Sequence, residues 1–373
     1  MELADRPETG SRQVVFLSGG LDSRMILAGL TEVFDSSEIV AATFGRPGEQ
    51  DFDFAAMVAQ EAGVQHERLE SSSVDWTTDG LVDSVLAREL PLAAPFGQRY
   101  LSYLLHQQLG RDSVFWDGLC GGPVAGSAQG QGADTGDWEA ALEHFIQLHL
   151  LADHQQLVTS GFDPRSLLPK APTCPQELMS YRQQLDFGIR QRCRIGTRLL
   201  RNYQIRLPFL AGPWLHFMLA VPSRYRNNKY LYREIAQEAF PRLFALPTTA
   251  SLGDAPARSR AGTKARQLKR RATRKAREVG LFTATPSPPA SGANTWLHGS
   301  VVRPGLLRDL AQENIADLAR RGIVDWADVL AHAPEQSAAP DYRVVTRLLN
   351  LELNLKTSEM VGDGGLEPPT SSV

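Results

Sequence analysis

The segment VVFLSGGLDSRMILAGL, Val14 to Leu30, constrains the fold more than any other part of the sequence. Its first apolar residues are typical of a short buried strand, and its last ones have the spacing of an amphipathic helix. Between them lie Ser18, Gly19, Gly20, Asp22 and Ser23. A glycine-rich turn between a strand and a helix presents backbone amides at the positive end of the helix dipole, which favours an anion. The segment therefore predicts a phosphate-binding turn.

The residues that follow continue the alternation of strand and helix. Residues 38–44 and 64–70 predict two more strands, and residues 51–63 predict an amphipathic helix that ends at Gly63. A strand is also expected from residue 113, running into a second glycine-rich turn, DGLCGG. Strands and helices at this spacing are typical of a parallel sheet with right-handed crossovers. The fold class is therefore α/β, with a large helical part in the C-terminal half.

Composition limits the kind of protein this is. The net charge of −3 gives no general attraction to polyanions, so we do not expect nucleic acid as a partner. The three cysteines form no CxxC pair, which fits a reducing compartment. No apolar run reaches the roughly 18 residues of a membrane helix, and the polar N-terminus does not resemble a signal peptide. We therefore expect a cytoplasmic protein without a membrane partner.

One domain is expected over residues 12–355. Its expected parts are a nucleotide-binding core at 12–125, a helical part at 138–245, a basic helix with flanking loops at 246–295 and C-terminal helices at 296–355. Residues 356–373 have no packing pattern and are expected to be disordered. The basic segment at 264–279 favours a solvated helix, and tRNA binding is its alternative. His66 is expected to be structural, packing or capping beside its strand.

The chemistry of the first turn indicates a metal. Asp22 would repel a phosphate unless a divalent cation lay between them, so its presence predicts Mg²⁺. The turn lacks the GxxxxGK[ST] pattern of the Walker loop. SGGxDS at a strand–helix junction resembles the PP-loop of the ATP pyrophosphatases, which implies an adenine nucleotide alpha hydrolase-like core. That resemblance implies attack on the α-phosphate of ATP and release of pyrophosphate.

Other segments, in the same order along the chain, resemble the synthetase domain of the asparagine synthetase family over about residues 12–250. The matching segments are LSGGLDSR, ATFGRPGEQDFDFAAMVAQEAGVQH, DGLCGG, IRLPFL and VPSRYRNNKYLYREIAQEAFP. The family's patterns for the last three are SGxGGDE, VRxPFLD and a stretch with K, R and P at this spacing. The resemblance implies an ATP-dependent ligase that adenylylates a carboxylate and lets an amine or ammonia displace AMP.

The resemblance also assigns roles to individual residues. It implies that Leu17 and Phe44 contact adenine and ribose, largely through the backbone, and that Gly118 lies beside the ribose or the α-phosphate. It implies that Asp22 holds Mg²⁺ and that pyrophosphate is cradled by Ser18, Gly19, Gly20 and Ser23. Lys229 and Arg233 lie four residues apart, so they share a helix face and are candidates to approach pyrophosphate or to be surface cations.

Several positions depart from the family's pattern. Its second Mg²⁺ carboxylate falls on Gly122, the glutamate after it on Pro123, and its catalytic lysine on about Thr249. Asp117 or Asp254 is a candidate to replace the carboxylate. Lys264 or Arg258 is a candidate to replace the cation. We therefore expect weakened or redirected chemistry.

We expect the protein to lack the family's glutaminase domain, so ammonia is expected from solution or from a separate glutaminase chain. Two alternatives to the ligase remain open. One is a degenerate nucleotide-binding or partner-binding module, indicated by Leu119, Gly122, Pro123 and Thr249. The other is a PP-loop enzyme that adenylylates tRNA, indicated by the basic segment.

Overall fold

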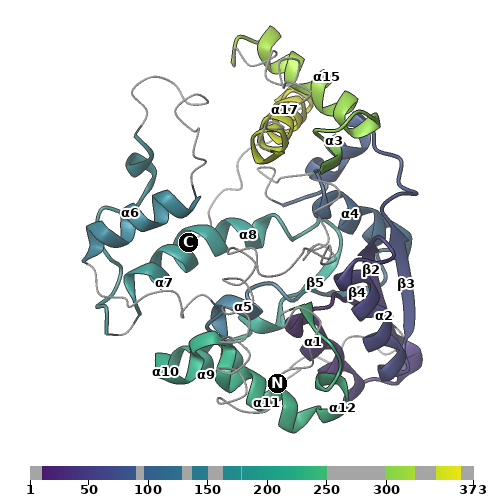
Figure 1. The fold of residues 1–373 in the computed structure, drawn as a ribbon, viewed down its shortest axis with the longest axis vertical. Helices are drawn as coiled ribbons and strands as arrows, with labels where there is room; N and C mark the ends of the chain where they lie inside the picture. Colours follow the sequence, from purple (N-terminus) through teal and green to yellow (C-terminus); the bar gives the residue numbers. More distant parts are fainter. Residues whose placement is uncertain are drawn as a thin grey trace, which may run out of the picture. The chain divides into compact units, whose positions relative to one another are not determined.

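The computed structural model describes residues 11–89, 96–127, 137–149, 163–177, 179–249, 299–323 and 342–362. The chain divides into two compact units, and each is built from separate stretches of sequence (Figure 1). The first unit consists of Met1–Val74, Leu101–Gln131 and Asn202–Trp296. The second consists of Asp75–Tyr100, Gly132–Arg201 and Leu297–Val373. The expected core at 12–125 is therefore only part of a unit that also takes in residues after 201.

The first unit contains a five-stranded sheet in the order β3-β2-β1-β4-β5. All of its neighbouring strands are parallel. The strands are β1 (Gln13–Phe16), β2 (Ile39–Gly45), β3 (Gln65–Glu70), β4 (Val114–Trp116) and β5 (Gln204–Arg206). The predicted α/β class is confirmed.

Burial explains why some strands were recognisable and one was not. β1, β2 and β4 are almost continuously buried, which is typical of strands covered on both faces of a parallel sheet. β3 lies at one edge and has a half-exposed, charged sequence. β5 lies at the other edge, is three residues long and contains a single apolar residue, Ile205, so periodicity did not predict it.

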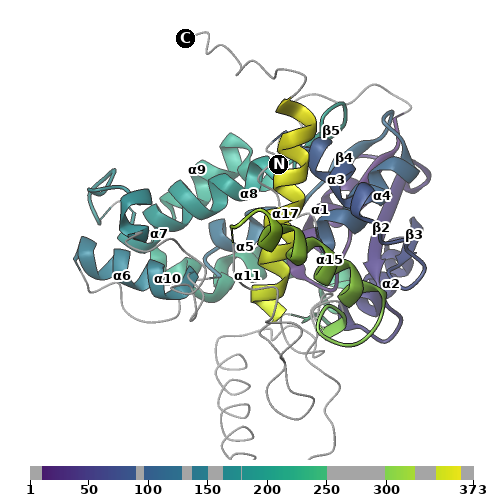
Figure 2. The ribbon, with the colours of Figure 1, turned by 90° about the horizontal axis from the view of Figure 1, so that it is seen from above.

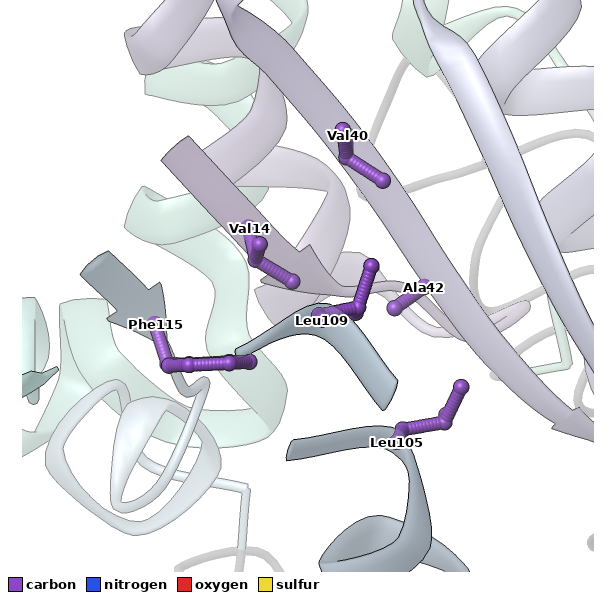
Figure 3. Packing of buried hydrophobic residues seen from close by; sticks show 6 residues of the cluster. All are labelled: Val14, Val40, Ala42, Leu105, Leu109 and Phe115. Atoms are coloured by element: carbon purple, nitrogen blue, oxygen red, sulfur yellow. The ribbon is translucent and has the colours of Figure 1, made fainter. Parts of the chain in front are cut away.

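Helices cover both faces of the sheet. The strand order places the crossovers through α1 (Leu21–Thr31) and α2 (Gln50–Ala62) on one face and the return through α4 (Gln98–Leu109) on the other. Figure 3 shows Leu105 and Leu109 of α4 among side chains from three strands. Those strand residues are Val14, Val40, Ala42 and Phe115. The predicted helix end at Gly63 is confirmed, because this residue has the left-handed conformation with φ 68°.

The rest of the described part of the first unit contains short helices that follow the strands. They are η1 (Ser36–Glu38), α5 (Gly121–Val124), η5 (Pro208–Leu210), α9 (Gly212–Ala220), α10 (Ser223–Arg226), η6 (Asn227–Lys229), α11 (Tyr230–Ala239) and α12 (Pro241–Phe244). Tyr232 and Ala236 form the buried stripe of α11, one turn apart. This stripe marks the face of α11 that is buried.

The second unit is helical in its described part. Its helices are α3 (Thr78–Leu86), α6 (Trp138–His149), η3 (Pro164–Leu167), α7 (Tyr181–Leu185), the π-helical turn η4 (Asp186–Gln191), α8 (Arg192–Gly196), α15 (Leu306–Arg320) and α17 (Tyr342–Gly362). α15 and α17 pack side by side, with leucines of both helices buried (Figure 2). α17 extends to residue 362, beyond the expected boundary at 355, and Thr357 is buried.

Several predictions fall outside the described residues. The basic segment 264–279 is among them, together with Asp254, Arg258 and Lys264. In the described part of the chain, no helix is long and apolar enough to cross a membrane.

Candidate functional site

The two glycine-rich turns lie at the carboxyl edge of the sheet, after neighbouring strands. The turn that we call the first turn, residues 17–23, follows β1, and the second turn, residues 117–127, follows β4. The strand order reverses here, because β2 and β3 lie on one side of β1 while β4 and β5 lie on the other. Open α/β sheets bind ligands in the crevice at such a reversal. The topology therefore brings both predicted turns to the expected position of a ligand site.

The two turns approach each other because glycines leave the space between them open. A Cβ atom on Gly121 would lie 2.8 Å from Cγ of Asp22 and 2.9 Å from ring atoms of Phe209. A Cβ atom on Gly118 would lie at ordinary contact distance, 3.4 Å from the amide nitrogen of Ser23. Glycine is therefore required at position 121 if the carboxylate of Asp22 is to face the second turn.

Hydroxyl groups and one carboxylate organise the first turn. The amide of Ser18 donates to Oγ of Ser23 at 3.1 Å, and the two hydroxyls lie 3.2 Å apart. The amide of Gly20 donates to Oγ of Ser18 at 3.2 Å. The amide of Gly19 donates to Oδ1 of Asp51 at 3.1 Å. The residues expected to cradle phosphate therefore lie together. The backbone amides of this turn donate to the side-chain oxygens of Ser18, Ser23 and Asp51.

Asp22, the second residue of α1, forms an ion pair with Lys229. Nζ of Lys229 lies 2.7 Å from Oδ1 and 2.9 Å from Oδ2, so it binds both carboxylate oxygens. The side chains are only 14% and 25% exposed, for Lys229 and Asp22 respectively. At this degree of burial an ion pair is screened less than on the surface, so the contact is energetically significant. Of the two cations expected on one helix face, Lys229 and Arg233, Lys229 thus lies at the first turn.

The second turn helps to hold Lys229 in place. A Cβ atom on Gly126 would lie 2.4 Å from the carbonyl oxygen of Arg226, and the carbonyl of Gly126 accepts from the amide of Asn228 at 3.2 Å. Asn228 and Lys229 both have left-handed backbones, with φ of 57° and 59°. This conformation is unfavourable for lysine. The strained backbone therefore turns Lys229 toward Asp22 immediately before α11 begins.

Tyr232 and Arg233 follow Lys229 on α11. The ring centroid of Tyr232 lies 5.4 Å from Nζ of Lys229, and its hydroxyl lies 3.3 Å from the carbonyl oxygen of Leu21. Burial, followed by the nearby Asp22 carboxylate, raises the pKa of Tyr232 well above its ordinary value, so the phenol stays protonated. Arg233, the other candidate cation, is half-buried.

Leu17 and Phe44, expected beside adenine and ribose, already make contacts within the protein, and so does Asp117. The amide of Leu17 donates to the carbonyl of Ala42 at 2.9 Å. The side chain of Phe44 packs against the core cluster of Figure 3. Oδ1 of Asp117 accepts from the amide of Leu119 at 2.8 Å, which shapes the start of the second turn. The nucleotide-binding roles of these residues stay predictions.

His66 supports the first turn through a chain of hydrogen bonds. Its Nε2 lies 2.9 Å from Oγ1 of Thr43, and that hydroxyl donates to the carbonyl of Leu17 at 2.9 Å. Since the hydroxyl proton goes to Leu17, Nε2 of His66 is the donor to Thr43. Burial, followed by the charge of Arg68, lowers the pKa of His66 to about 4. The structural role expected for His66 is confirmed.

A support that sequence reasoning missed comes from Arg24. This fully buried side chain donates to the carbonyls of Leu243 and Leu246, at 3.0 Å each, and of Pro247 at 2.6 Å. Burial lowers its pKa to about 10. The available signal was its position, three and four residues before buried Leu27 and Ala28, which places a charge on the buried face of α1.

The segment held by Arg24 closes over Gly19. Oγ1 of Thr248 and the amide of Thr249 both donate to the carbonyl of Gly19, at 2.8 and 3.1 Å. A Cβ atom on Gly19 would lie 2.7 Å from Cγ2 of Thr249. The position at which the resemblance expects a lysine therefore lies at the first turn, and an uncharged threonine occupies it.

The residues around Asp22 fit a protein-held Mg²⁺ poorly. Mg²⁺ requires oxygen donors in near-octahedral geometry. Lys229 binds both oxygens of Asp22, and Gly121, Gly122 and Pro123 of the second turn carry no side-chain oxygen. In the part of the chain that the structure describes, no group of three or more His, Cys, Asp or Glu residues could hold a metal ion. The metal role of Asp22 stays a prediction.

Comparisons with known proteins find a match to the segment that carries the first turn and the start of the second. None of the curated proteins matches the chain. Residues 4–121 match the model of the asparagine synthase family, from before β1 to Gly121. The match covers the PP-loop and the start of the second turn, and the resemblance after residue 121 stays a prediction. Residues 4–121 are therefore similar to part of an asparagine synthase domain.

Proposed function

We propose that the first unit binds ATP at the first turn and that the protein is an amide-forming ligase. A carboxylate oxygen of the substrate attacks the α-phosphorus of ATP, and the bond from that phosphorus to the bridging oxygen of pyrophosphate breaks. An amine or ammonia then attacks the acyl carbon, AMP leaves, and the nitrogen loses a proton to solvent. The family match at residues 4–121 supports this reaction class.

The observation that carries the proposal is the position of Lys229 at the first turn. Its ammonium lies 2.7 Å from Asp22, at the start of α1, where the helix dipole already favours an anion. A fixed positive charge there stabilises the negative charge that develops on departing pyrophosphate. In this proposal Asp22 positions Lys229, and the hydroxyls of Ser18 and Ser23 turn from each other to the phosphates.

The partners of the reaction are a small-molecule or peptide carboxylate and an amine or ammonia. Ammonia comes from solution or from a separate glutaminase chain. We place the reaction in the cytoplasm. No step is routed through Mg²⁺, because the donors around Asp22 fit that ion poorly.

Product analysis tests the proposal. The purified protein is incubated with ATP, ammonia and a panel of carboxylates that begins with aspartate, and AMP and pyrophosphate are quantified. Lys229→Met should lower kcat/KM for AMP formation by about 10²–10³-fold, the usual effect of removing one fixed charge or donor from such a site. Lys170→Met, the same substitution at an exposed lysine, is the matched control and should change nothing. Formation of ADP and phosphate in place of AMP and pyrophosphate would exclude the proposed reaction.

A nucleotide-binding module without turnover is the second candidate. It is favoured by Thr249, which brings no charge to Gly19, and by Lys229, which binds both oxygens of Asp22. This candidate predicts that ATP binds and stays intact with every carboxylate of the panel. Detection of AMP with any of them would eliminate it.

A further inference from the structure

The ammonium of Lys229 lies where the first and second turns meet. It binds both oxygens of Asp22, and a Cβ atom on Gly122 would lie 3.4 Å from Nζ. The side chain is 14% exposed, so the charge is largely removed from bulk water. A positive charge at this place faces the same carboxylate that would otherwise need a metal ion as its partner.

The geometry leaves the ammonium able to bind a ligand as well. A lysine ammonium has three N–H donors, and two of them are directed at Asp22. Among the described residues the third has no hydrogen-bond acceptor, and the ring centroid of Tyr232 lies 5.4 Å from Nζ. A phosphate oxygen that reaches the start of α1 would supply that acceptor.

The charges around the site differ from those of a metal-dependent one. A bare aspartate repels the phosphates of ATP, and a bound divalent cation reverses that repulsion. Here Lys229 neutralises Asp22 directly. The side chains of Gly121, Gly122 and Pro123 in the second turn add neither a negative charge nor an oxygen donor for a metal. Asp22 therefore has a protein cation as its partner and needs no metal ion before ATP can approach.

We propose that the ammonium of Lys229 replaces a protein-held divalent cation, so that the site binds the polyphosphate of ATP without one. The inference rests on the proposed ATP site and goes further, because it removes the metal requirement from binding. It predicts that Asp22 acts on the nucleotide through Lys229 and ligates no ion.

Calorimetric titration of ATP into the full chain, with excess EDTA or with Mg²⁺, tests the inference. The dissociation constant of the wild-type protein should change by less than about threefold between the two conditions, under half of the 1.4 kcal/mol that corresponds to a factor of ten. A wild-type dissociation constant at least about tenfold higher in EDTA than in Mg²⁺ would overturn the inference and leave the proposed function intact. No binding under either condition would overturn both.

Variants at position 229 separate the ammonium from the fold. Lys229→Met exposes the charge of Asp22 to the nucleotide, so the dissociation constant in EDTA should rise about tenfold or more, with a smaller rise in Mg²⁺. Lys229→Arg keeps the charge and should stay within about threefold of wild type in EDTA. Lys170→Met is the matched control, and circular dichroism checks that each variant is folded. Unchanged ATP binding by folded Lys229→Met in EDTA would overturn the inference.

Discussion

The first and second turns have similar glycine content and different structures. In the first turn, hydroxyls of Ser18 and Ser23 accept from backbone amides at the start of α1. In the second turn the middle residues Leu119 and Cys120 are buried, and Cys120 takes a left-handed backbone at the start of α5. The first turn is thus organised by hydrogen bonds of its hydroxyl groups, whereas the second packs through buried apolar side chains.

This difference shows that a glycine-rich turn can position a group as well as bind one. Gly121 leaves space for the carboxylate of Asp22, and Gly126 lets the chain before Lys229 approach. The second turn therefore contributes to the site through a lysine that lies about a hundred residues later in the sequence, rather than through side chains of its own. Four changes probe this division of roles.

The largest effect is expected from Arg24→Met, which removes the support of the first turn. Three carbonyl oxygens lose a charged donor in a buried place, so the free energy of unfolding should fall by about 3–5 kcal/mol. Urea denaturation measures the change. Arg201→Met, at an exposed arginine, is the control and should stay within about 0.5 kcal/mol of wild type. A similarly small loss for Arg24→Met would show that the segment over Gly19 is held by other contacts.

Gly126→Ala should disturb the second turn and leave the first intact. A methyl group there would lie 2.4 Å from the carbonyl oxygen of Arg226, and the backbone has φ of 88°. We expect the free energy of unfolding to fall by about 2–3 kcal/mol. Gly48→Ala is the matched control, because Gly48 has φ of 89° with nothing near its Cβ position, and it should lose only about 1 kcal/mol. Equal losses in denaturant titrations would mean that the contact with Arg226 is unimportant.

The support of the first turn by His66 should depend on pH. The folded-state pKa is lowered to about 4 from the ordinary 6.5, so the unfolded chain binds the proton more strongly. This contribution to stability is present above pH 6.5 and is lost as the pH falls toward about 4. His66→Gln keeps an N–H donor for Thr43 and does not titrate. The urea midpoint of wild type should therefore fall more steeply than that of the variant between these pH values, and parallel curves would refute the assigned protonation.

The smallest effect is expected from Asn228→Gly, beside Lys229. Glycine adopts the left-handed backbone without strain, although the unfolded chain gains entropy, so stability should rise by about 0.5 kcal/mol. Asn202→Gly is a matched comparison, since Asn202 is also exposed and has φ of 65°. Equal increases in thermal melts would show ordinary local strain at Asn228. A decrease at Asn228 alone would show that its side chain helps to hold Lys229.

Local signals made the sheet and the first turn predictable from the sequence. Buried apolar runs marked β1, β2 and β4, and the repeat of α2 ended in a glycine that proved to be left-handed. β5 carried too few apolar residues to show a pattern, and the extent of α17 was underestimated because its last two turns are largely polar. Elements were thus predictable where burial imposes a period on the sequence.

The site was predictable only in part, because its decisive contacts join distant residues. The turn itself suggested an anion site, and helical spacing made Lys229 a candidate cation. Nothing local indicates that this lysine meets Asp22, or that Asp51 accepts from Gly19. These contacts depend on the strand order and on the left-handed backbone before α11, which a single sequence does not encode in any short pattern.

The contact between Asp22 and Lys229 spans 207 positions of the chain. During synthesis at about 5–20 residues per second, the aspartate leaves the ribosome roughly 10–40 s before the lysine does. When the aspartate leaves the ribosome, β5 and α11 have not yet been made, although β1 and the start of α1 have. For that interval the nascent turn carries a carboxylate without its ammonium, so completion of the ion pair marks a late step in the maturation of the first unit.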